Sequence, residues 1–555
     1  MRRHLVFVFL LVGCSLLAQS TPGTFSAADV VAHWRAAVHA YKASRSADVK
    51  TISTEDGIPG SIEEWIAPDA YRRSVRRHFD NSEWLLAHNV RERKDWNGWV
   101  RNIEGKEMER LQSAIAETQA VLFGPSNELE TAEVSRTSDG NSYILRYKPQ
   151  GGLETSWYID AKTFLPIRSV RPGEDTEIST TYSAWKVVNG VLTPFHGVVA
   201  ETDKPEFIWD RERIEYGPTP SRETFARLVP GASDTILSST AKPIPFTLEA
   251  NHIVFDISLN GYPPMPWILD TGADQNVVNS ARAKEFGIRE YAKTTTTGGG
   301  NSAEYGYAAG ATLARPGIEI RNQHVATIDQ SGLEQALGMK FGGILGYDFI
   351  SRFVMEIDYE KHIITLHDPK TWSYSGHGFI VPVVFDNGIP HASGSIAVPT
   401  KANIPAYFVV DFGASETATL TSSFVKANDL ARLAQTNINV NRPAGLEKQF
   451  FAQNNVRGHL DRLTIGNLTV TDVPVNMSVN TTGAYASANF SGTVGESIYS
   501  RYHVYLDYAR NRIILEPTPE SDKPFPPRET YGLTLLASGT DLHTYTVAAV
   551  RAGSP

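Results

Sequence analysis

The apolar positions near the start of the chain first follow a helical pattern and then an alternating one. Ser26, with Asp29 three residues later, forms a capping-box-like helix start. The hydrophobic residues that follow fall on one helical face, at Val30, Val31, Trp34, Ala37, Val38 and Tyr41. From about residue 50 to 215, short runs alternate between apolar and polar residues and are broken by Gly, Pro, Asn and Asp. The pattern predicts one helix followed by a meander of strands that forms a curved antiparallel sheet.

An internal repeat follows this sheet region. Each copy has an apolar strand that ends in aspartate, within "WILDTGADQNVV" (267–278) in the first copy and "YFVVDFGASETATL" (407–420) in the second. Each copy then has a later glycine and a second aspartate. Their separation along the chain is identical in the two copies, for the pairs Gly343 and Asp358, and Gly492 and Asp507. The equal spacing predicts two copies of one supersecondary unit.

The length of the chain fits this organisation. A sequence of 555 residues is expected to form roughly three to four domains. The predicted boundaries are a signal peptide at 1–20, a sheet domain at 24–216, a linker rich in Pro, Ser, Thr and Gly at 217–245, the two repeat copies at 246–370 and 371–520, and a C-terminal segment at 528–555.

The N-terminus predicts export. Two arginines precede an apolar run from Leu5 to Ala18, which is typical of a secretory signal peptide and too short for a membrane span. "AQS" at 18–20 offers an ordinary cleavage site, which predicts a soluble periplasmic or secreted protein. The residues Leu11 to Cys14 also resemble a bacterial lipobox, so the alternative is lipidation of Cys14 and an envelope-anchored lipoprotein.

Composition narrows the chemistry. The net charge of −9 argues against nucleic acid as the main partner, and no later stretch is apolar enough to span a membrane. Cys14 is the one cysteine, so a disulfide or a cysteine zinc site is not expected in the mature chain. The 15 histidines lack metal-ligand spacing. We therefore expect neither a metal nor a cofactor.

The aspartates of the repeat are candidates for acid–base chemistry. Asp270 and Asp411 each follow a buried apolar strand, where an ionised carboxylate is costly unless it is hydrogen-bonded or paired. Gly272 and Gly413 would allow a tight turn that aims backbone N–H groups at these carboxylates. If the copies associate around a pseudo-twofold axis, the two carboxyl groups meet. Carboxyl groups about 3 Å apart cannot both ionise, so one serves as a base for water and the other as an acid.

These motifs resemble the retropepsin-type aspartic peptidases of exported bacterial proteins, with two protease lobes in one chain. The resemblance covers about half of the sequence. It implies catalytic aspartates at Asp270 and Asp411 and a glycine-rich flap over the substrate, with its tip at Gly298, Gly299 and Gly300 within "TTTTGGGNSAEYGY" (294–307). The supporting residues that it implies are Thr271, Gly272, Ala273, Phe412, Gly413 and Ala414, followed by the glycine elements Ile344-Leu345-Gly346 and Thr493-Val494-Gly495.

The second copy departs from the family at Phe412, where the family has Thr or Ser. The resemblance implies that this hydroxyl crosses the twofold axis to bind the partner loop, so Thr271 can make its half of the contact and Phe412 cannot. We expect the Phe412 ring to be buried against the first copy, near Thr271. The letters Asp411-Phe412-Gly413 also match the kinase metal-binding triplet, but the other kinase motifs do not precede them.

Two further regions resemble known domains. Pieces of residues 27–215, among them "EEWIAPDAYRRSV" (63–75), are similar to periplasmic lipoprotein-sorting carriers. The tryptophans of this region, Trp65, Trp84, Trp96 and Trp99, are expected to pack in the core. The segment 528–555 resembles the opening of a PDZ domain, whose members bind peptide ends by strand addition.

The sequence therefore predicts a mainly β protein in which tandem acid-protease lobes form one pseudo-twofold site, preceded by a curved antiparallel sheet domain. The expected function is an aspartic endopeptidase that acts on a peptide or protein substrate, with Asp270 and Asp411 as general base and general acid. We expect a monomeric active unit. The alternatives are an envelope carrier protein with vestigial lobes, and a homodimer in which only the first copy is competent.

Overall fold

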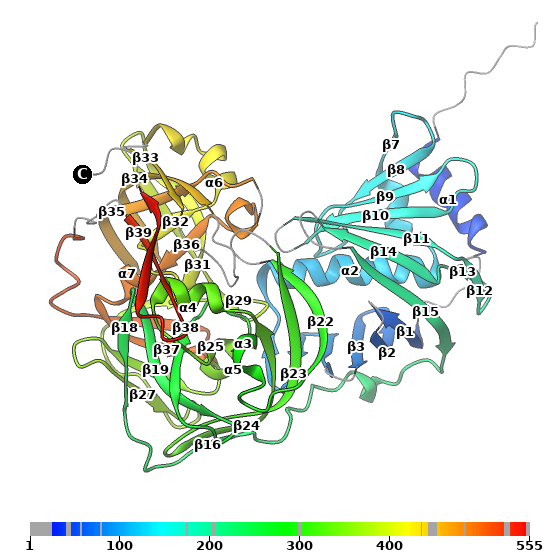
Figure 1. The fold of residues 1–555 in the computed structure, drawn as a ribbon. Coiled ribbons are helices and arrows are strands. Elements are labelled where there is room, and N and C mark those ends of the chain that lie inside the picture. The colour runs from blue at the N-terminus through cyan, green and yellow to red at the C-terminus, as the bar shows by residue number, and fades with distance from the viewer. Residues whose placement is uncertain are drawn as a thin grey trace, which may run out of the picture.

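The structure is a computed structural model of the whole chain. It describes residues 25–39, 46–55, 58–77, 80–173, 176–201, 206–297, 302–433, 436–441, 452–481, 483–526 and 533–550. The protein is mainly β, as predicted, and its strands form one large N-terminal sheet and a group of sheets that build two lobes (Figure 1). The lipidation candidate Cys14 lies outside the described residues.

The N-terminal domain is one antiparallel sheet of 13 strands in the order β6-β5-β4-β3-β2-β1-β15-β14-β11-β10-β9-β8-β7. Helix α1 (Ala27–Ala37) begins at the predicted capping box, in which Ser26 and Asp29 bond each other's backbone N–H groups. The strands are β1 (Ala47–Glu55), β2 (Ile58–Ala67), β3 (Ala70–Arg77), β4 (Glu83–Ala87), β5 (Val90–Lys94), β6 (Val100–Asn102), β7 (Glu133–Arg136), β8 (Ser142–Tyr147), β9 (Thr155–Asp160), β10 (Pro166–Pro172), β11 (Glu177–Ser183), β14 (His196–Glu201) and β15 (Phe207–Tyr216), with a separate hairpin of β12 (Lys186–Val188) and β13 (Val191–Thr193).

The prediction of one helix in this domain is wrong. A second helix, α2 (Gly105–Phe123), interrupts the meander and packs against the sheet (Figure 1). Its buried residues include Met108, Ile115 and Leu122. The helix lacks a side-chain N-cap, and Gly105 starts it with a positive φ of 56°. The usual start signals are therefore absent from the sequence at this point.

Each lobe is a sheet that repeats one plan. The first consists of β16 (Thr235–Leu237), β18 (Thr247–Glu249), β19 (His252–Leu259), β20 (Met265–Leu269), β21 (Val277–Asn279), β22 (Glu290–Thr297), β23 (Ser302–Arg315), β24 (Ile318–Ile328) and β25 (Gly343–Leu345), with α3 (Ser280–Ala283), α4 (Ser331–Leu337) and α5 (Tyr347–Ile350). The second consists of β29 (Val384–Asp386), β30 (Ile389–Val398), β31 (Lys401–Asp411), β32 (Ala418–Leu420), β33 (Thr436–Asn441), β34 (Ala452–Ile465), β35 (Leu468–Ser478) and β36 (Gly492–Gly495), with α6 (Ser422–Ala427) and α7 (Glu496–Tyr499).

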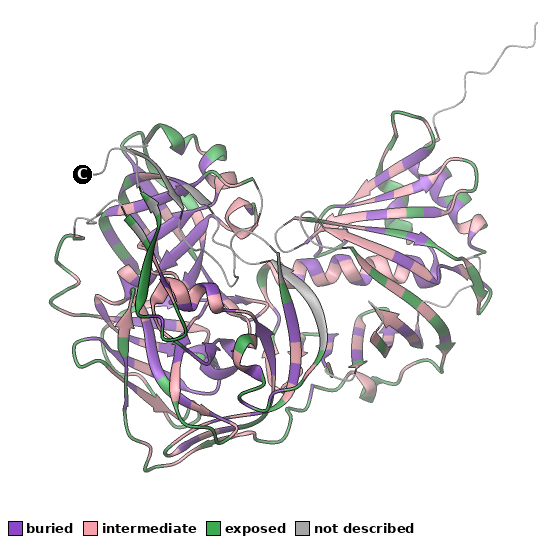
Figure 2. Cartoon of the chain, viewed as in Figure 1, coloured by how far each residue is buried: buried purple, intermediate pink, exposed green. Residues whose placement is uncertain are grey.

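A third sheet joins the lobes. Its six strands are β17 (Ile244–Pro245), β27 (Ile363–His367), β26 (Val354–Asp358), β37 (Tyr502–Asp507), β38 (Arg512–Pro517) and β28 (Phe379–Pro382), in this order. At its centre Glu356 of β26 lies opposite Tyr505 of β37, and Met355 and Ile357 lie opposite Leu506 and Val504. Glu356 and Tyr505 are equivalent positions of the repeat, so the pairing is symmetric about them. One hydrophobic core runs through both lobes, and short strands such as β21 and β36 are buried along their whole length (Figure 2).

The predicted linker is partly built into the lobes. Residues 217–245 contain a 3₁₀ turn at Arg222–Phe225, and then β16 and β17. β16 pairs with β24 and β17 with β27, and Ile244 is fully buried. Strands of two or three residues are too short to produce a visible period in the sequence.

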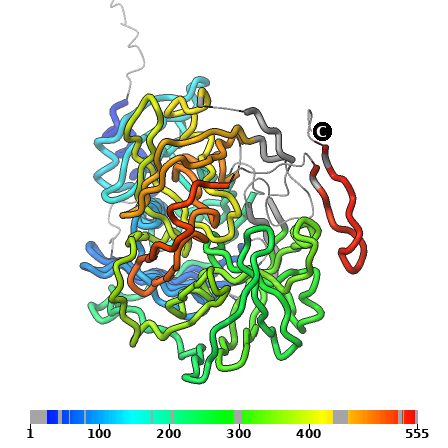
Figure 3. Tube along the Cα trace, turned by 90° about the vertical axis from the view of Figure 1, so that its left-hand side faces the viewer, coloured from blue at the N-terminus to red at the C-terminus, as the bar shows by residue number. Residues whose placement is uncertain are grey.

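The C-terminal segment forms a hairpin on the outside of the first lobe. β39 (Leu533–Ser538) pairs with β40 (Thr544–Val550), and the hairpin contacts α4 (Figures 2 and 3). Two strands do not test the resemblance to a PDZ domain, which stays a prediction. The exposed side chains of the hairpin include Leu533, Leu535, Tyr545, Val547 and Val550.

Candidate active site

The first catalytic-loop candidate follows β20, whose last residues are fully buried. Ile268 and Leu269 pair in parallel with β25, and the N–H of Asp270 donates to the carbonyl of Leu345 at 3.0 Å. The chain then turns, and the N–H of Gly272 donates to Oδ1 of Asp270 at 2.7 Å. The N–H of Tyr347 donates to the carbonyl of Ala273 at 3.0 Å, which fixes the loop against α5.

The second candidate loop repeats this geometry. Strand β31 runs in parallel beside β36, with Asp411 opposite Gly495. The N–H of Gly413 donates to Oδ1 of Asp411 at 2.8 Å, and the N–H of Glu496 donates to the carbonyl of Ala414 at 2.8 Å. The glycine elements inferred from the sequence, ending in Gly346 and Gly495, therefore hold equivalent places behind the two loops.

The two loops meet, and they bring Asp270 and Asp411 together. Their carboxyl groups interact directly, and each residue has intermediate exposure. A Cβ at Gly272 would lie 2.9 Å from the Asp411 carboxyl oxygens, and one at Gly413 would overlap the Asp270 carboxyl group. Glycine is needed here for this close approach, and neither residue has a positive φ.

Thr271 ties the loops together. Its hydroxyl donates to the carbonyl of Val410 at 2.7 Å and accepts from the N–H of Phe412 at 2.9 Å. The ring of Phe412 is fully buried, as predicted, and its packing against the first lobe stays a prediction. It stacks on Tyr499 of its own lobe, with ring centroids 4.4 Å apart and planes 6° from parallel.

The electrostatics of the pair favour one shared proton. Removal from water raises the pKa of both carboxyl groups, and the charge of Asp411 raises the pKa of Asp270 further. The backbone N–H groups of Gly272 and Gly413 lower the two pKa values in part. A pair in this environment can hold one ionised and one protonated carboxyl group.

Two groups near the pair were not predicted from the sequence. Tyr485 lies in the 3₁₀ turn Ala484–Ala486. Burial is the main cause that raises the pKa of its phenol, and the nearby charge of Asp411 raises it further. Glu496 is fully buried directly after Gly495, and its carboxyl group interacts with the hydroxyl of Tyr359. Burial raises the pKa of its carboxyl group well above the ordinary range. No motif in the sequence marks either residue.

The flap candidates fall partly outside the described residues. Gly298, Gly299 and Gly300 lie outside the described residues. The strands on either side of them, β22 and β23, are paired as far as Thr297, which lies opposite Ser302 (Figure 1). Farther along β23, the hydroxyl of Tyr305 accepts a hydrogen bond from Nε2 of Gln275, so this strand contacts the Asp270 loop. In the second lobe β33 and β34 form the corresponding hairpin.

Comparisons with known proteins agree with this geometry in one lobe. Residues 255–349, from β19 to α5, match the family model described as aspartyl protease. This region, which contains Asp270, is therefore aspartyl protease-like. A solved structure of the aspartic proteinase from Irpex lacteus has 13% sequence identity and a TM-score of 0.34, and the alignment covers 51% of this chain and 98% of that one. Comparison with curated protein sequences found no significant match.

Neither a metal cluster nor a membrane-spanning helix is found in the described part of the chain. No group of three or more His, Cys, Asp or Glu side chains there could hold a metal ion. None of its helices combines the length and the apolar character that crossing a membrane requires.

Proposed function

We propose that the protein is an aspartic endopeptidase whose catalytic pair is Asp270 and Asp411. The observation that carries the proposal is the meeting of the two carboxyl groups, each at the end of a buried strand and each against the glycine of the other loop. The family match over residues 255–349 supports a peptidase activity for the first lobe. Polypeptide is accordingly the proposed substrate class.

The proposed mechanism uses a water molecule bound between the two carboxyl groups. The ionised carboxylate accepts a proton from this water as the oxygen attacks the peptide carbonyl carbon, while the protonated carboxyl group donates its proton to the carbonyl oxygen. The resulting tetrahedral gem-diol breaks the C–N bond when the amine nitrogen accepts a proton from the pair, and one diol hydroxyl returns its proton to the pair as the C=O bond re-forms. The two products are a carboxylic acid and an amine, and the pair again holds one proton.

The roles of the flanking regions are also proposals. We propose that the β22–β23 hairpin covers the substrate, with Gly298, Gly299 and Gly300 as the flap residues. We propose export of the protein to the periplasm or the medium, with lipidation at Cys14 as the alternative. The carrier-like and PDZ-like resemblances are consistent with a cell-envelope substrate.

The test is digestion of a peptide library by wild type, Asp270→Asn and Asp411→Asn. Asparagine cannot take or share the proton, so both variants should lose turnover while remaining folded. Near-normal cleavage by Asp411→Asn would favour a homodimer of the first lobe, and sizing of the active enzyme would check this. An absence of cleavage by wild type across the pH range would favour the carrier hypothesis.

A further inference from the structure

Each lobe extends one hairpin turn to the other lobe's candidate loop. In the first lobe, Nδ2 of Asn251, in the β18–β19 turn, donates to the carbonyl of Ser415 at 2.9 Å. In the second lobe, Nδ2 of Asn387, in the β29–β30 turn, donates to Oδ2 of Asp274 at 3.4 Å. Ser415 and Asp274 occupy the same position after Asp411 and Asp270. The two contacts are therefore equivalent, and each lobe supports the loop that carries the other aspartate.

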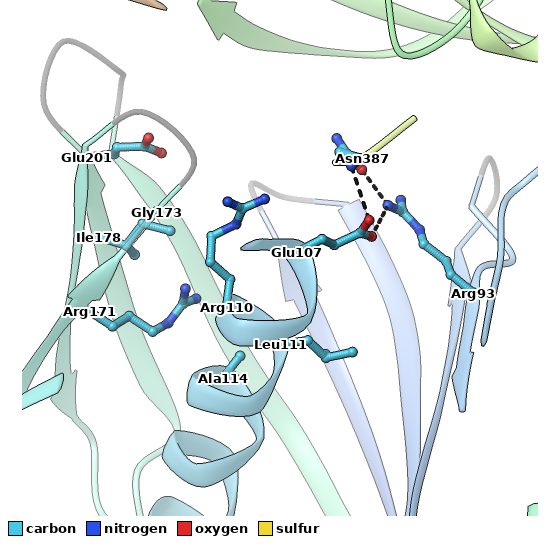
Figure 4. A pocket seen from close by; sticks show the side chains of 10 residues that line it. All are labelled: Arg93, Glu107, Arg110, Leu111, Ala114, Arg171, Gly173, Ile178, Glu201 and Asn387. Atoms are coloured by element: carbon cyan, nitrogen blue, oxygen red, sulfur yellow. Dashed lines mark hydrogen bonds and ion pairs between the residues drawn. The ribbon is translucent and has the colours of Figure 1, made fainter. Parts of the chain in front are cut away.

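The contact of Asn387 with Asp274 differs from that of Asn251 with Ser415, because residues of the N-terminal domain also bond to Asn387. The backbone N–H of Asn387 donates to Oε2 of Glu107 at 3.1 Å, and its side-chain oxygen accepts from Arg93 (Figure 4). Glu107 lies at the start of α2 and Arg93 on β5, so both belong to the N-terminal sheet domain. The asparagine thus joins three parts of the molecule: this domain, the second lobe and the Asp270 loop.

The ion pairs behind Asn387 are mostly buried. Arg101 of β6 donates twice to the Glu107 carboxylate, at 2.8 Å each, and Arg93 lies 3.3 Å from the same carboxylate. The side chains of Arg101 and Glu107 are 10% and 11% exposed. A bidentate pair with so little solvent access has few alternative geometries, so it holds the Asn387 backbone in one position.

The charge of this cluster reaches the loop itself. Burial raises the pKa of the Asp274 carboxyl group, and the positive charges of Arg93 and then Arg101 lower it in part. Beside Asn387, Arg110 of α2 forms an ion pair with Asp386. The turn is therefore fastened to the N-terminal domain on both sides of its contact with Asp274.

The N-terminal domain also contacts the other side of the first lobe. Asn97 accepts from the N–H of His324 at 2.7 Å, and Trp99 packs against the core of the lobes, where the guanidinium of Arg352 lies 5.3 Å from its ring. Arg352 follows α5, which holds Ala273. The domain thus contacts the first lobe directly at β24 and next to α5, in addition to its contact through Asn387.

We propose that the N-terminal domain is part of the catalytic unit, and that Arg93, Glu107 and Asn387 are positioning residues that fix the Asp270 loop. This inference rests on the proposed peptidase function, because the loop is catalytic only under that proposal. A loop fixed through a chain of contacts keeps its carboxyl group at the productive distance, and small displacements there reduce turnover strongly.

The surroundings of the cluster make substitution interpretable. Arg93, Glu107 and Asn387 line a pocket together with residues of α2, β10 and β11, among them Arg110, Leu111 and Arg171 (Figure 4). Water from the pocket can fill the space that a shortened side chain leaves here, so repacking of the core is not required. Asn387 has a φ of 50°, which glycine and aspartate tolerate.

Two substitutions separate the two links. Asn387→Asp keeps the oxygen that accepts from Arg93 but replaces the amide nitrogen that donates to Asp274 with a negatively charged oxygen. Arg93→Met leaves the contact between Asn387 and Asp274 and removes the bond from the domain to the Asn387 side chain, while Glu107 still accepts from the Asn387 backbone. We expect each change to lower kcat on the order of tenfold with little change in KM, and Arg93→Lys to recover part of the loss.

The matched control is Asn489→Ala. Nδ2 of Asn489 donates to the carbonyl of Gly173 at 3.2 Å, so this variant also removes a carboxamide contact between the second lobe and the N-terminal domain. Its kcat should stay within about twofold of wild type. A kcat loss in the control equal to that of Asn387→Asp would show a general docking effect and overturn the proposal.

A second readout does not depend on activity. Hydrogen–deuterium exchange of a peptide covering residues 268–278 should be faster in Asn387→Asp and Arg93→Met than in wild type and Asn489→Ala, in full-length protein of equal melting temperature. If wild type cleaves no peptide, the proposed function fails and the exchange data still decide this inference. Unchanged exchange, or unchanged kcat in an active enzyme, would overturn it. If a variant unfolds, Asn387→Gly and Arg93→Lys replace it.

Discussion

The hydroxyl of Thr271 accepts a hydrogen bond from the backbone N–H of Phe412 at 2.9 Å, across the pseudo-twofold axis. The reverse contact cannot form from a phenylalanine side chain, and the Phe412 ring turns toward Tyr499 instead. The hydroxyl of Thr271 thus helps to join the two loops, and the stacked pair of Phe412 and Tyr499 supports the second one. This asymmetry leads to separate predictions for the two residues.

Replacing Thr271 with valine should reduce both stability and turnover. Valine has nearly the same shape but leaves the buried Phe412 N–H and Val410 carbonyl without their partner, which costs about 1–3 kcal/mol for each group. Thr271→Ser, which keeps the hydroxyl, is the control. Denaturant unfolding and kcat/KM on one peptide would measure both effects, and equal values for valine and serine would contradict the prediction.

Replacing Phe412 with threonine should destabilise the second lobe. Loss of a buried ring stacked on Tyr499 leaves a cavity and costs about 3 kcal/mol or more. Water admitted there would lower the pKa of Asp411, so in a variant that stays folded the pH–rate profile should move to lower pH. Phe412→Leu, which fills more of the space, should show smaller changes, and an unmoved profile in a folded Phe412→Thr protein would argue against desolvation by this ring.

The proposed catalytic pair, Asp270 and Asp411, should lower the stability of the folded protein at neutral pH. Both carboxyl groups have folded-state pKa values raised above their unfolded values, so the folded state binds more protons and loses stability as pH rises. Asp270→Asn removes this cost. Its melting temperature should exceed that of wild type at pH 8, and the difference should vanish near pH 3. A lower melting temperature for the variant at pH 8 would contradict the raised pKa values.

Asp348 should make the contact between the domains sensitive to pH. It is buried at the start of α5, where burial and the neighbouring charge of Asp95 raise its pKa to about 7, against the lowering effect of Arg352. Because the folded pKa is raised, stability should fall as pH rises from about 4 to about 7 and then level off. Asp348→Asn should flatten this part of the unfolding curve, which thermal unfolding at a series of pH values would measure.

The flap hypothesis predicts a kinetic effect. Replacing Gly298, Gly299 and Gly300 with alanine should stiffen the tip of the β22–β23 hairpin and slow opening and closing, which in lids occurs on the μs–ms scale. Turnover should fall more than melting temperature. Unchanged kinetics would place the substrate-covering segment elsewhere.

Much of the lobe architecture could be predicted because its signals are local. An apolar strand followed by Asp-x-Gly-Ala, and the equal separation of Gly343 from Asp358 and of Gly492 from Asp507, are visible in the sequence and correspond to equivalent strands in the structure. The first helix was predicted for the same reason, because its capping box is local.

The remaining features depend on contacts between distant parts of the chain. The stacking of Phe412 on Tyr499 and the bond between Arg93 and Asn387 join segments that no periodicity connects. Glu496 resembles an ordinary surface glutamate in the sequence, and only the fold buries it. Helix α2 was missed because it lacks a capping signal and begins with glycine.

The pairing of β26 with β37 has a consequence for the order in which the chain can mature. β26 has β27 on one side, but its other edge is covered only by residues 502–507. Until those residues have been synthesised, or translocated, this edge offers unsatisfied backbone groups to any other strand. The sheet that joins the lobes therefore cannot be completed until residues 502–507 have emerged, and aggregation is the hazard of that interval. A chaperone that binds extended segments would act most usefully before residue 507 is available.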